Sequence, residues 1–221
     1  MVQFKSYDDI GVSTEGHVAT IEIQRPPHNF FDYSLIQQIA DAMETIDKDN
    51  NLRCVVLCAQ GKSFCAGANF GSDGSSANRS QENNPTDKSS HLYVEAVRLF
   101  ATKTPIVGAI QGAAIGGGLG LSLVPDFRVA CPESRFAANF TRLGFHPGFG
   151  LTHTLPALIG NQRATLMFYT SRRIKGEEAY EWGLADMLVP LEEVRTAATD
   201  LAKEISAVSY THLTLPTTGV V

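Results

Sequence analysis

Hydrophobic residues in the first fifth of this chain repeat with two different periods. Residues 18–23 alternate between apolar and polar side chains, which predicts a strand that ends before residues 25–27, Arg-Pro-Pro. Residues 34–46 repeat with the period of a helix, and Ser34 with Gln37 has the pattern of a capping box. We therefore expect a strand and then a helix capped by Ser34. The apolar face of that helix contains Leu35, Ile36, Ile39, Ala40, Met43 and Ile46.

Two later apolar runs, residues 53–59 and 105–112, are continuous, which predicts buried strands. Each leads into a turn of small residues. The first turn covers residues 60–70, and the second, with three consecutive glycines, covers residues 115–120. Open α/β sheets bind ligands at the carboxyl ends of their strands. N–H groups at a helix start can bind an oxyanion, and glycine lets a substrate approach them. Taken by itself, the glycine turn is explained equally well by an oxyanion site and by a tight strand–helix junction that binds no ligand. Two such turns together can each supply one N–H group to a single carbonyl oxygen.

The remaining chain alternates short helices and strands, which predicts an α/β spiral. Residues 71–91 are rich in Gly, Ser, Asn and Asp, and we expect a long flexible loop there. The helix that follows should place Leu92, Val97, Leu99 and Phe100 inward. That helix covers residues 90–102. The other predicted helices cover residues 117–124, 151–158, 161–169, 176–182 and 191–207, and the other predicted strands cover 127–131 and 187–189.

Composition indicates an ordinary globular domain. The chain has 221 residues, of which 43% are hydrophobic and 19% charged. A net charge of −5 argues against nucleic acid or an anionic membrane as the main partner. We found no apolar run of membrane-spanning length and no signal segment, so we expect a cytoplasmic protein. The four cysteines and the histidines match no metal or redox spacing. Cys65, beside the first turn, is either a packing residue or a thiol nucleophile, and we favour packing.

Five sequence blocks then point to a family. They are residues 63–69 (SFCAGAN), 111–118 (QGAAIGGG), 126–130 (DFRVA), 143–150 and 183–186 (GLAD). In sequence and order they resemble the enoyl-CoA hydratase/isomerase (crotonase) family over residues 10–207. The resemblance implies a crotonase-like spiral of ββα units. It also implies an acyl-CoA substrate, no cofactor or metal beyond the coenzyme A of that substrate, and a homotrimer or dimer of trimers.

The resemblance assigns residues 1–207 to one core domain. Residues 208–221 break the helical pattern, and we expect a non-native or disordered tail there. Family members continue with helices that help to form trimers, so we expect a truncated C-terminal helical region and no reliable trimer for this chain.

The resemblance also suggests the chemistry. It places two oxyanion-hole N–H groups at Ala66 and Gly117. Family hydratases carry two glutamates, and the matching positions hold Gly120 and Phe140. Because neither residue activates water or donates a proton, two-glutamate hydration is not expected. His146 is the best alternative acid or base, with His91 and Tyr93 as further candidates, while Asp126 is expected to be structural.

Several functions stay open. An enzyme that stabilises a thioester enolate suits isomerisation, decarboxylation, thioester hydrolysis or an unconventional hydration. A catalytically silent acyl-CoA binder and a structural subunit are the alternatives. Arg25 and Lys62 are either phosphate ligands or surface charges, and Phe70, Phe140 and Phe145 are expected in the acyl pocket. The substrate-binding positions implied by the resemblance are Arg25, Pro27, His28, Phe30, Lys62, Ala66, Gly67, Ala68, Asn69, Phe70, Gly116, Gly117, Gly120 and Phe140.

Overall fold

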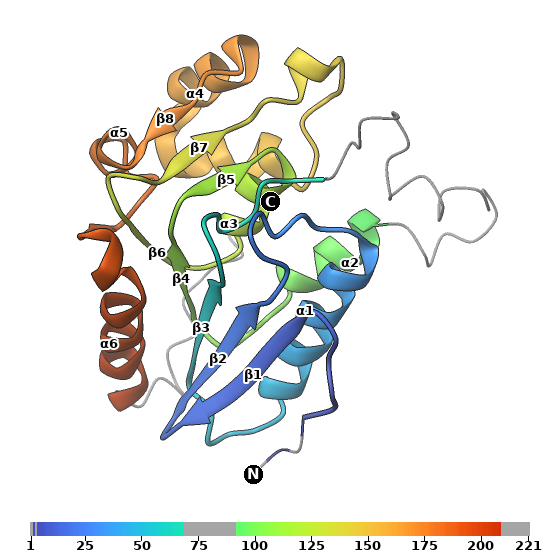
Figure 1. The fold of residues 1–221 in the computed structure, drawn as a ribbon, viewed down its shortest axis with the longest axis vertical. Helices are drawn as coiled ribbons and strands as arrows, with labels where there is room; N and C mark the ends of the chain where they lie inside the picture. Colours follow the sequence, from blue (N-terminus) through green and yellow to red (C-terminus); the bar gives the residue numbers. More distant parts are fainter. Residues whose placement is uncertain (1, 3, 69–91, 209–221) are drawn as a thin grey trace, which may run out of the picture.

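A six-stranded sheet forms the centre of the computed structural model, which describes residues 2, 4–68 and 92–208 (Figure 1). Its strand order is β1-β2-β3-β4-β6-β9. The β1/β2 pair is antiparallel, and the other neighbours are parallel. The carboxyl ends of the parallel strands therefore share one edge. The strands are β1 (Ile10–Glu15), β2 (Val18–Ile23), β3 (Cys54–Ala59), β4 (Ile106–Ile110), β6 (Phe127–Ala130) and β9 (Met187–Leu188).

A smaller sheet in the order β5-β7-β8 lies beyond that edge (Figure 1). Its strands are β5 (Ala113–Ile115), β7 (Arg135–Ala137) and β8 (Ile174–Lys175). The chain passes from β4 to β5 through Gly112, whose φ is +64°. A Cβ atom added at Gly112 would lie 1.9 Å from the Lys62 carbonyl oxygen. Glycine at this position therefore lets the second sheet begin directly against the turn that follows β3.

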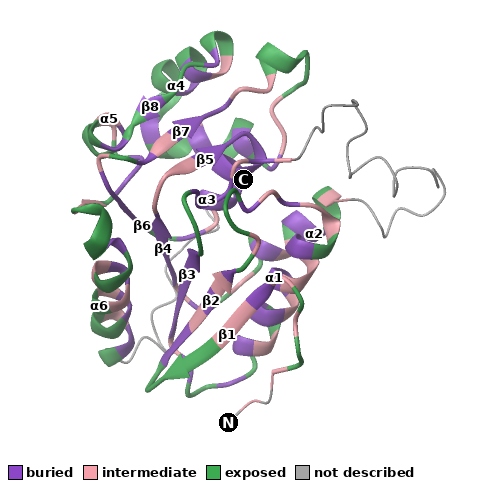
Figure 2. Ribbon diagram, viewed as in Figure 1, coloured by how far each residue is buried: buried purple, intermediate pink, exposed green. Residues whose placement is uncertain are grey.

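Helices cover both faces of the large sheet (Figures 1 and 2). In β3, Val55 and Leu57 belong to the core that includes the apolar face of α1, whereas Val56 packs in the core that includes α6. Side chains alternate along a strand, so this continuously apolar strand is buried on both sides. The helices are α1 (Tyr33–Ile46), α2 (Leu92–Leu99), α3 (Gly117–Ser122), α4 (Leu151–Thr170), α5 (Gly176–Glu181) and α6 (Val194–Ala207), with 3₁₀ turns at Thr141–Leu143 and Leu191–Glu193.

The main sequence predictions of secondary structure are confirmed. The strands at 18–23, 53–59, 105–112 and 127–131 are present within one or two residues at each end. The two helices expected at 151–158 and 161–169 form α4, in which Gly160 is non-helical with φ 80° and ψ 158°. The sequence analysis did not find β1, β5, β7 or β8. Three of these have only two or three residues, too few to show a period.

Two details of the predicted helices are wrong. Asp32, not Ser34, caps α1, because its side chain accepts a hydrogen bond from the Leu35 N–H at 3.0 Å. Val97 in α2 is 66% exposed and Phe100, just after α2, is 42% exposed, although both were predicted to face inward. Glu95 is buried instead, at 6% exposure, because it bonds to Tyr33 on α1.

Three further expectations concern the long loop, the C-terminal tail and membrane-spanning helices. The loop predicted at 71–91 and all but the first residue of the predicted tail at 208–221 lie outside the described residues. None of the helices within the described ranges is both long and apolar enough to cross a bilayer.

Candidate active site

The two small-residue turns pack directly against each other. The Cys65 N–H donates to the Ala113 carbonyl at 2.9 Å, and the Ile115 N–H donates to the Cys65 carbonyl at 3.1 Å. A Cβ atom at Gly118 would lie 2.0 Å from the Cys65 oxygen, and one at Gly67 would lie 2.7 Å from the Ile115 oxygen. Neither position has room for a side chain. The glycines therefore bring two backbone segments, distant in sequence, into van der Waals contact.

Gly117 presents a free backbone donor at this contact. Gly116 has φ 58° and ψ −120°, a conformation that favours glycine, and its N–H donates to the Ala137 carbonyl at 2.8 Å. Gly117 is the first residue of α3, so its N–H has no acceptor inside the helix. Within the part of the chain that the structure describes, this N–H meets no other backbone carbonyl. Gly117 is buried, so an acceptor placed there would be shielded from water.

Ala66 does not present a free donor. Its N–H donates to the His28 carbonyl at 2.9 Å. A backbone amide has one hydrogen, so in this conformation Ala66 has none for a substrate, and its assignment as an oxyanion donor does not fit the structure.

The N–H of Ala68, unlike that of Ala66, has no backbone acceptor among the described residues. The Phe31 N–H bonds to the Gly67 carbonyl, and Phe31 pairs with Ala68 as a parallel bridge. In that pattern the N–H of Ala68 itself faces away from Phe31. Among the described residues it bonds to no backbone carbonyl.

Asn29 fixes the first turn, a role that the sequence analysis missed. It is fully buried, and its side-chain amide donates to the carbonyls of Gln60 at 2.6 Å and Ser63 at 2.7 Å. Its side-chain oxygen accepts the Arg25 N–H at 3.0 Å. The backbone φ of Asn29 is +50°, a left-handed conformation that asparagine tolerates. The available signal was an asparagine in a proline-rich turn, which by itself indicates only local hydrogen bonding.

Arg25 is held by carboxylates rather than left free for phosphate. Its guanidinium contacts Asp9 at 2.6 Å and Asp32 at 2.8 Å. The hydrogen bond to Asp9 is the largest cause that raises the pKa of Arg25, and the same bond lowers the pKa of Asp9. Two negative groups on one cation leave this cluster with a net charge of −1. The expected contact between Arg25 and coenzyme A phosphates is therefore not supported.

The other residues predicted for the nucleotide end do lie together. The Lys62 N–H donates to the Pro27 carbonyl at 3.2 Å, which joins the turn after β3 to the loop after β2. The side chains of Pro27, His28 and Lys62 are exposed, and the His28 ring lies 5.5 Å from the ring of Phe30. Lys62 thus keeps an accessible positive charge beside the first turn.

Aromatic rings cover the glycines of α3. The ring of Phe31 lies 2.2 Å from the position of a Cβ at Gly117, and the Phe140 ring lies 3.9 Å from one at Gly116. At Gly120 an added Cβ would lie 2.5 Å from the Cβ of Phe149. Phe140 is therefore beside the glycine turn, as expected for a pocket residue. Neither Gly120 nor Phe140 brings a carboxylate to this site.

The remaining candidates have different surroundings. Burial raises the pKa of the Cys65 thiol to about 12, so it is a neutral packing residue at neutral pH. Asp126 accepts the Ile106 N–H at 2.8 Å, a structural contact. His146 is exposed in the segment that leads to α4, and Phe145 is 54% exposed. Asn69, Phe70 and His91 lie outside the described residues.

Comparison with known proteins establishes the family. The family model described as enoyl-CoA hydratase/isomerase matches residues 13–218. The chain belongs to the enoyl-CoA hydratase/isomerase family. It is an enzyme of this family with the crotonase fold, and its exact reaction is open.

Individual relatives give the scale of the similarity. Bacillus subtilis YngF, an enoyl-CoA hydratase/isomerase by name, is 34% identical over 193 residues, which cover 86% of this chain and 73% of the relative. The crotonyl-CoA hydratase of Syntrophomonas wolfei is 30% identical and is covered over 76% of its length. The crystal structure of an enoyl-CoA hydratase from Bacillus anthracis superposes with a TM-score of 0.82, at 31% identity and over 91% of this chain and 78% of that one.

In this family member the paired glycine turns are therefore the candidate acyl-CoA site. The structure brings together Gly67, Ala68, Gly116, Gly117, Gly120 and Phe140 on one side, and Pro27, His28, Phe30 and Lys62 on the other. The two groups meet at the bond between Ala66 and His28.

Proposed function

We propose that this chain binds an acyl-CoA thioester with the thioester oxygen between the N–H groups of Ala68 and Gly117. The observation that carries the proposal is the contact between the two turns, in which both N–H groups are left without backbone acceptors in the described structure. This proposal revises the sequence assignment in one respect, because Ala66 is replaced by Ala68 as the first donor.

Two fixed N–H groups suit a reaction in which negative charge develops on the thioester oxygen. An enolate forms when the α-carbon loses a proton, or when a carboxylate on it leaves as carbon dioxide, because the electron pair left behind moves onto that oxygen. Donors that are already oriented stabilise the charge without reorganisation, and each contributes about 2.7–4 kcal/mol to the transition state. Substrate chemistry of this kind agrees with the family membership of the chain.

The reaction is proposed to differ from hydration by two glutamates. Gly120 and Phe140 supply no acid or base, and Phe149 fills the space beside Gly120. Isomerisation, decarboxylation, thioester hydrolysis and unconventional hydration all pass through an oxyanion that these amides would stabilise. His146 is the proposed acid or base. The filled space at Gly120 also favours a second candidate, a catalytically silent acyl-CoA binder.

Calorimetric titration tests the binding step. Butyryl-CoA should bind more tightly than the matching thioether, S-butyl-CoA, which lacks the carbonyl oxygen. Each lost hydrogen bond to a buried acceptor contributes about 1 kcal/mol, so the difference should be about ten-fold or more. Equal affinities would contradict the two-amide site.

A turnover assay separates the enzyme from the silent binder. The panel is an enoyl-, a malonyl- and an aryl-CoA, each with the wild type and with His146→Ala. Turnover of any member excludes the silent binder. Turnover that persists in His146→Ala removes His146 from the mechanism.

A further inference from the structure

Two phenylalanines cover one face of α3. Phe31 lies against Gly117, and Phe149 lies against Gly120. Residues three apart in a helix share a face, so the two rings are neighbours along the same line. Their centroids are 5.9 Å apart, with an interplanar angle of 68°. An acyl chain that extends from a thioester at Gly117 along α3 would therefore meet Phe149 beside Gly120.

The backbone of Phe149 is unusual. Its φ is +56°, a conformation that side chains larger than asparagine rarely adopt. The ring is nevertheless 2% exposed. Residues held in such conformations persist where the surrounding structure determines them, and they gather at ligand sites. The strained backbone here directs a large ring into the space over Gly120.

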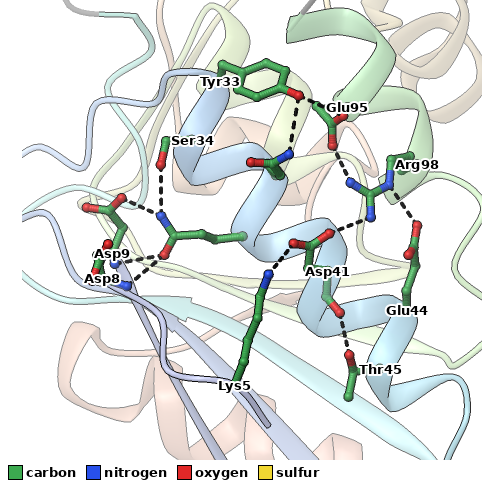
Figure 3. Close-up of polar contacts among 12 residues, drawn as sticks. Lys5, Asp8, Asp9, Tyr33, Ser34, Asp41, Glu44, Thr45, Glu95 and Arg98 are labelled. Carbon is green, nitrogen blue, oxygen red and sulfur yellow. Dashed lines mark hydrogen bonds and ion pairs between the residues drawn. The ribbon is translucent and has the colours of Figure 1, made fainter. Parts of the chain in front are cut away.

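The helix α2 holds Phe149 from the opposite side. The ring of Phe100, the residue after α2, makes an edge contact with that of Phe149, with ring centroids 6.3 Å apart. On α2 itself, the Tyr93 oxygen lies 2.1 Å from the position of a Cβ at Gly148. Polar contacts fix α2 on α1, where Tyr33 donates to Glu95 and Arg98 pairs with Glu95 and Asp41 (Figure 3). Phe149 is thus enclosed by α2, Phe31 and α3.

We propose that Phe149 is the residue that limits the size of the acyl group, so that the site takes short, unbranched acyl thioesters and rejects bulky ones. This inference rests on the proposed acyl-CoA site. The space that a larger acyl group needs beside Gly120 is occupied by the Phe149 ring, against which the rings of Phe31 and Phe100 pack. A smaller side chain at 149 opens this space.

Affinity ratios test the proposal. We compare acetyl-CoA with phenylacetyl-CoA in the wild type, in Phe149→Leu and in Phe136→Leu. Phe136 is a fully buried phenylalanine in β7 of the second sheet, so its variant controls for a general loosening of the core. Leucine keeps most of the apolar volume, which favours folding of both variants, and circular dichroism checks it. The expected result is a relative affinity for phenylacetyl-CoA that rises about ten-fold or more in Phe149→Leu only.

A second variant approaches the same space from α3. An alanine at Gly120 would place its Cβ 2.5 Å from that of Phe149. Gly120→Ala should therefore reduce thermal stability. Phe149→Gly in the same chain removes the Cβ that the alanine meets and suits the φ of +56°, so it should restore part of that stability.

The outcomes distinguish the inference from the function on which it rests. If the wild type binds both thioesters but the ratio stays unchanged in Phe149→Leu, or shifts equally in Phe136→Leu, the size limit is wrong and the acyl-CoA site stands. If no acyl-CoA binds the wild type, both the proposed function and the size limit fail.

Discussion

A residue at this site can bind a ligand only with polar groups that are not already paired within the protein. Ala66 has its N–H bonded to His28, and Arg25 has its charge paired with Asp9 and Asp32, so neither is free for a ligand. Ala68 and Lys62 carry the groups that remain available. Residue type alone would not have separated these cases.

Cys65 is expected to be chemically inert. Burial raises its pKa to about 12, so the thiol is neutral at pH 8. In the native protein we expect iodoacetamide to leave Cys65 unmodified for hours, and in urea to label it fast. The Cys65→Ser variant should keep acyl-CoA binding. Rapid labelling of Cys65 in the native state would show that the thiol is reachable and reactive.

Asn29 is expected to support the first turn. Asn29→Ala removes three hydrogen bonds and leaves two carbonyls without their buried donor, so we expect a loss of about 3 kcal/mol in the free energy of unfolding. Acyl-CoA affinity should fall as well, because Ser63 leads into the segment that holds Ala68. The matched control is Asn51→Ala, an exposed asparagine whose side-chain amide donates to Asp49. Urea unfolding and calorimetry measure both effects, and similar losses in the two variants would contradict this role.

Sequence could locate these residues only to within a turn. The small residues around Ala66 were recognised, but which amide is free depends on a carbonyl from His28, far away in the sequence. Similarly, Arg25 looked available because its partner Asp9 lies on another segment. Hydrogen-bond partners set by tertiary contacts have no periodic signal in a sequence.

At the scale of elements, the site depends on close contact between the β3 turn and the start of α3. Gly118→Ala should abolish acyl-CoA binding and lower the melting temperature, because its Cβ would lie 2.0 Å from the Cys65 carbonyl oxygen. Backbone atoms there cannot move aside without breaking the bond from Ile115 to Cys65. Gly11→Ala is the control, since its Cβ would meet only the flexible side chain of Gln24. Titration of both variants with butyryl-CoA decides the matter, and unimpaired binding by Gly118→Ala would refute the tight contact.

The contact between α1 and α2 is ionic (Figure 3). Arg98 bonds to Glu44 at 2.7 Å and to Asp41 at 2.6 Å, and also pairs with buried Glu95. Arg98→Ala leaves Glu95 without its cation, so we expect a loss of about 3 kcal/mol at pH 7. An exposed pair gives the control, because Arg172→Ala should cost about 0.5 kcal/mol or less.

The same contact predicts a pH dependence. The hydrogen bond from Arg98 lowers the pKa of Glu44; for Asp41, burial opposes ionisation, but the bonds from Lys5 and Arg98 outweigh it and lower the pKa. A lowered pKa stabilises the folded state above the unfolded pKa of about 4, and this stabilisation disappears as the pH falls through the folded value. Urea unfolding at pH 6 and pH 3 should therefore show a smaller difference between the wild type and Arg98→Ala at pH 3. A difference that is independent of pH would contradict the ionic account.

Elements with a clear period were predictable, and those without one were not. The apolar face of α1 was predicted from a helical period over residues 34–46, and β3 from an unbroken apolar run of six residues. The orientation of α2 was wrong because Glu95 is buried by a partner on α1, against its polarity. Strands of two or three residues, such as β8, are defined by pairing alone.

At the scale of the whole molecule, two sheets and two cores hold the site between them. Alternating residues of β3 and β4 face α1 on one side and α6 on the other, which fixes the strand ends from both faces. Arg128, 2% exposed, joins β6 to the β9 side through its bonds to the Leu184 carbonyl and Asp186. The smaller sheet then supplies Ala137, whose carbonyl holds Gly116. The glycine turn is thus supported by elements from nearly the entire described chain.

The measurement that tests the central claim most directly is a crystal structure of the protein with butyryl-CoA. We predict that the thioester oxygen lies about 2.7–3.2 Å from the backbone nitrogens of both Ala68 and Gly117, with the Ala66 N–H still bonded to His28. A thioester oxygen that points to solvent, or that contacts neither of these two amides, would contradict the account.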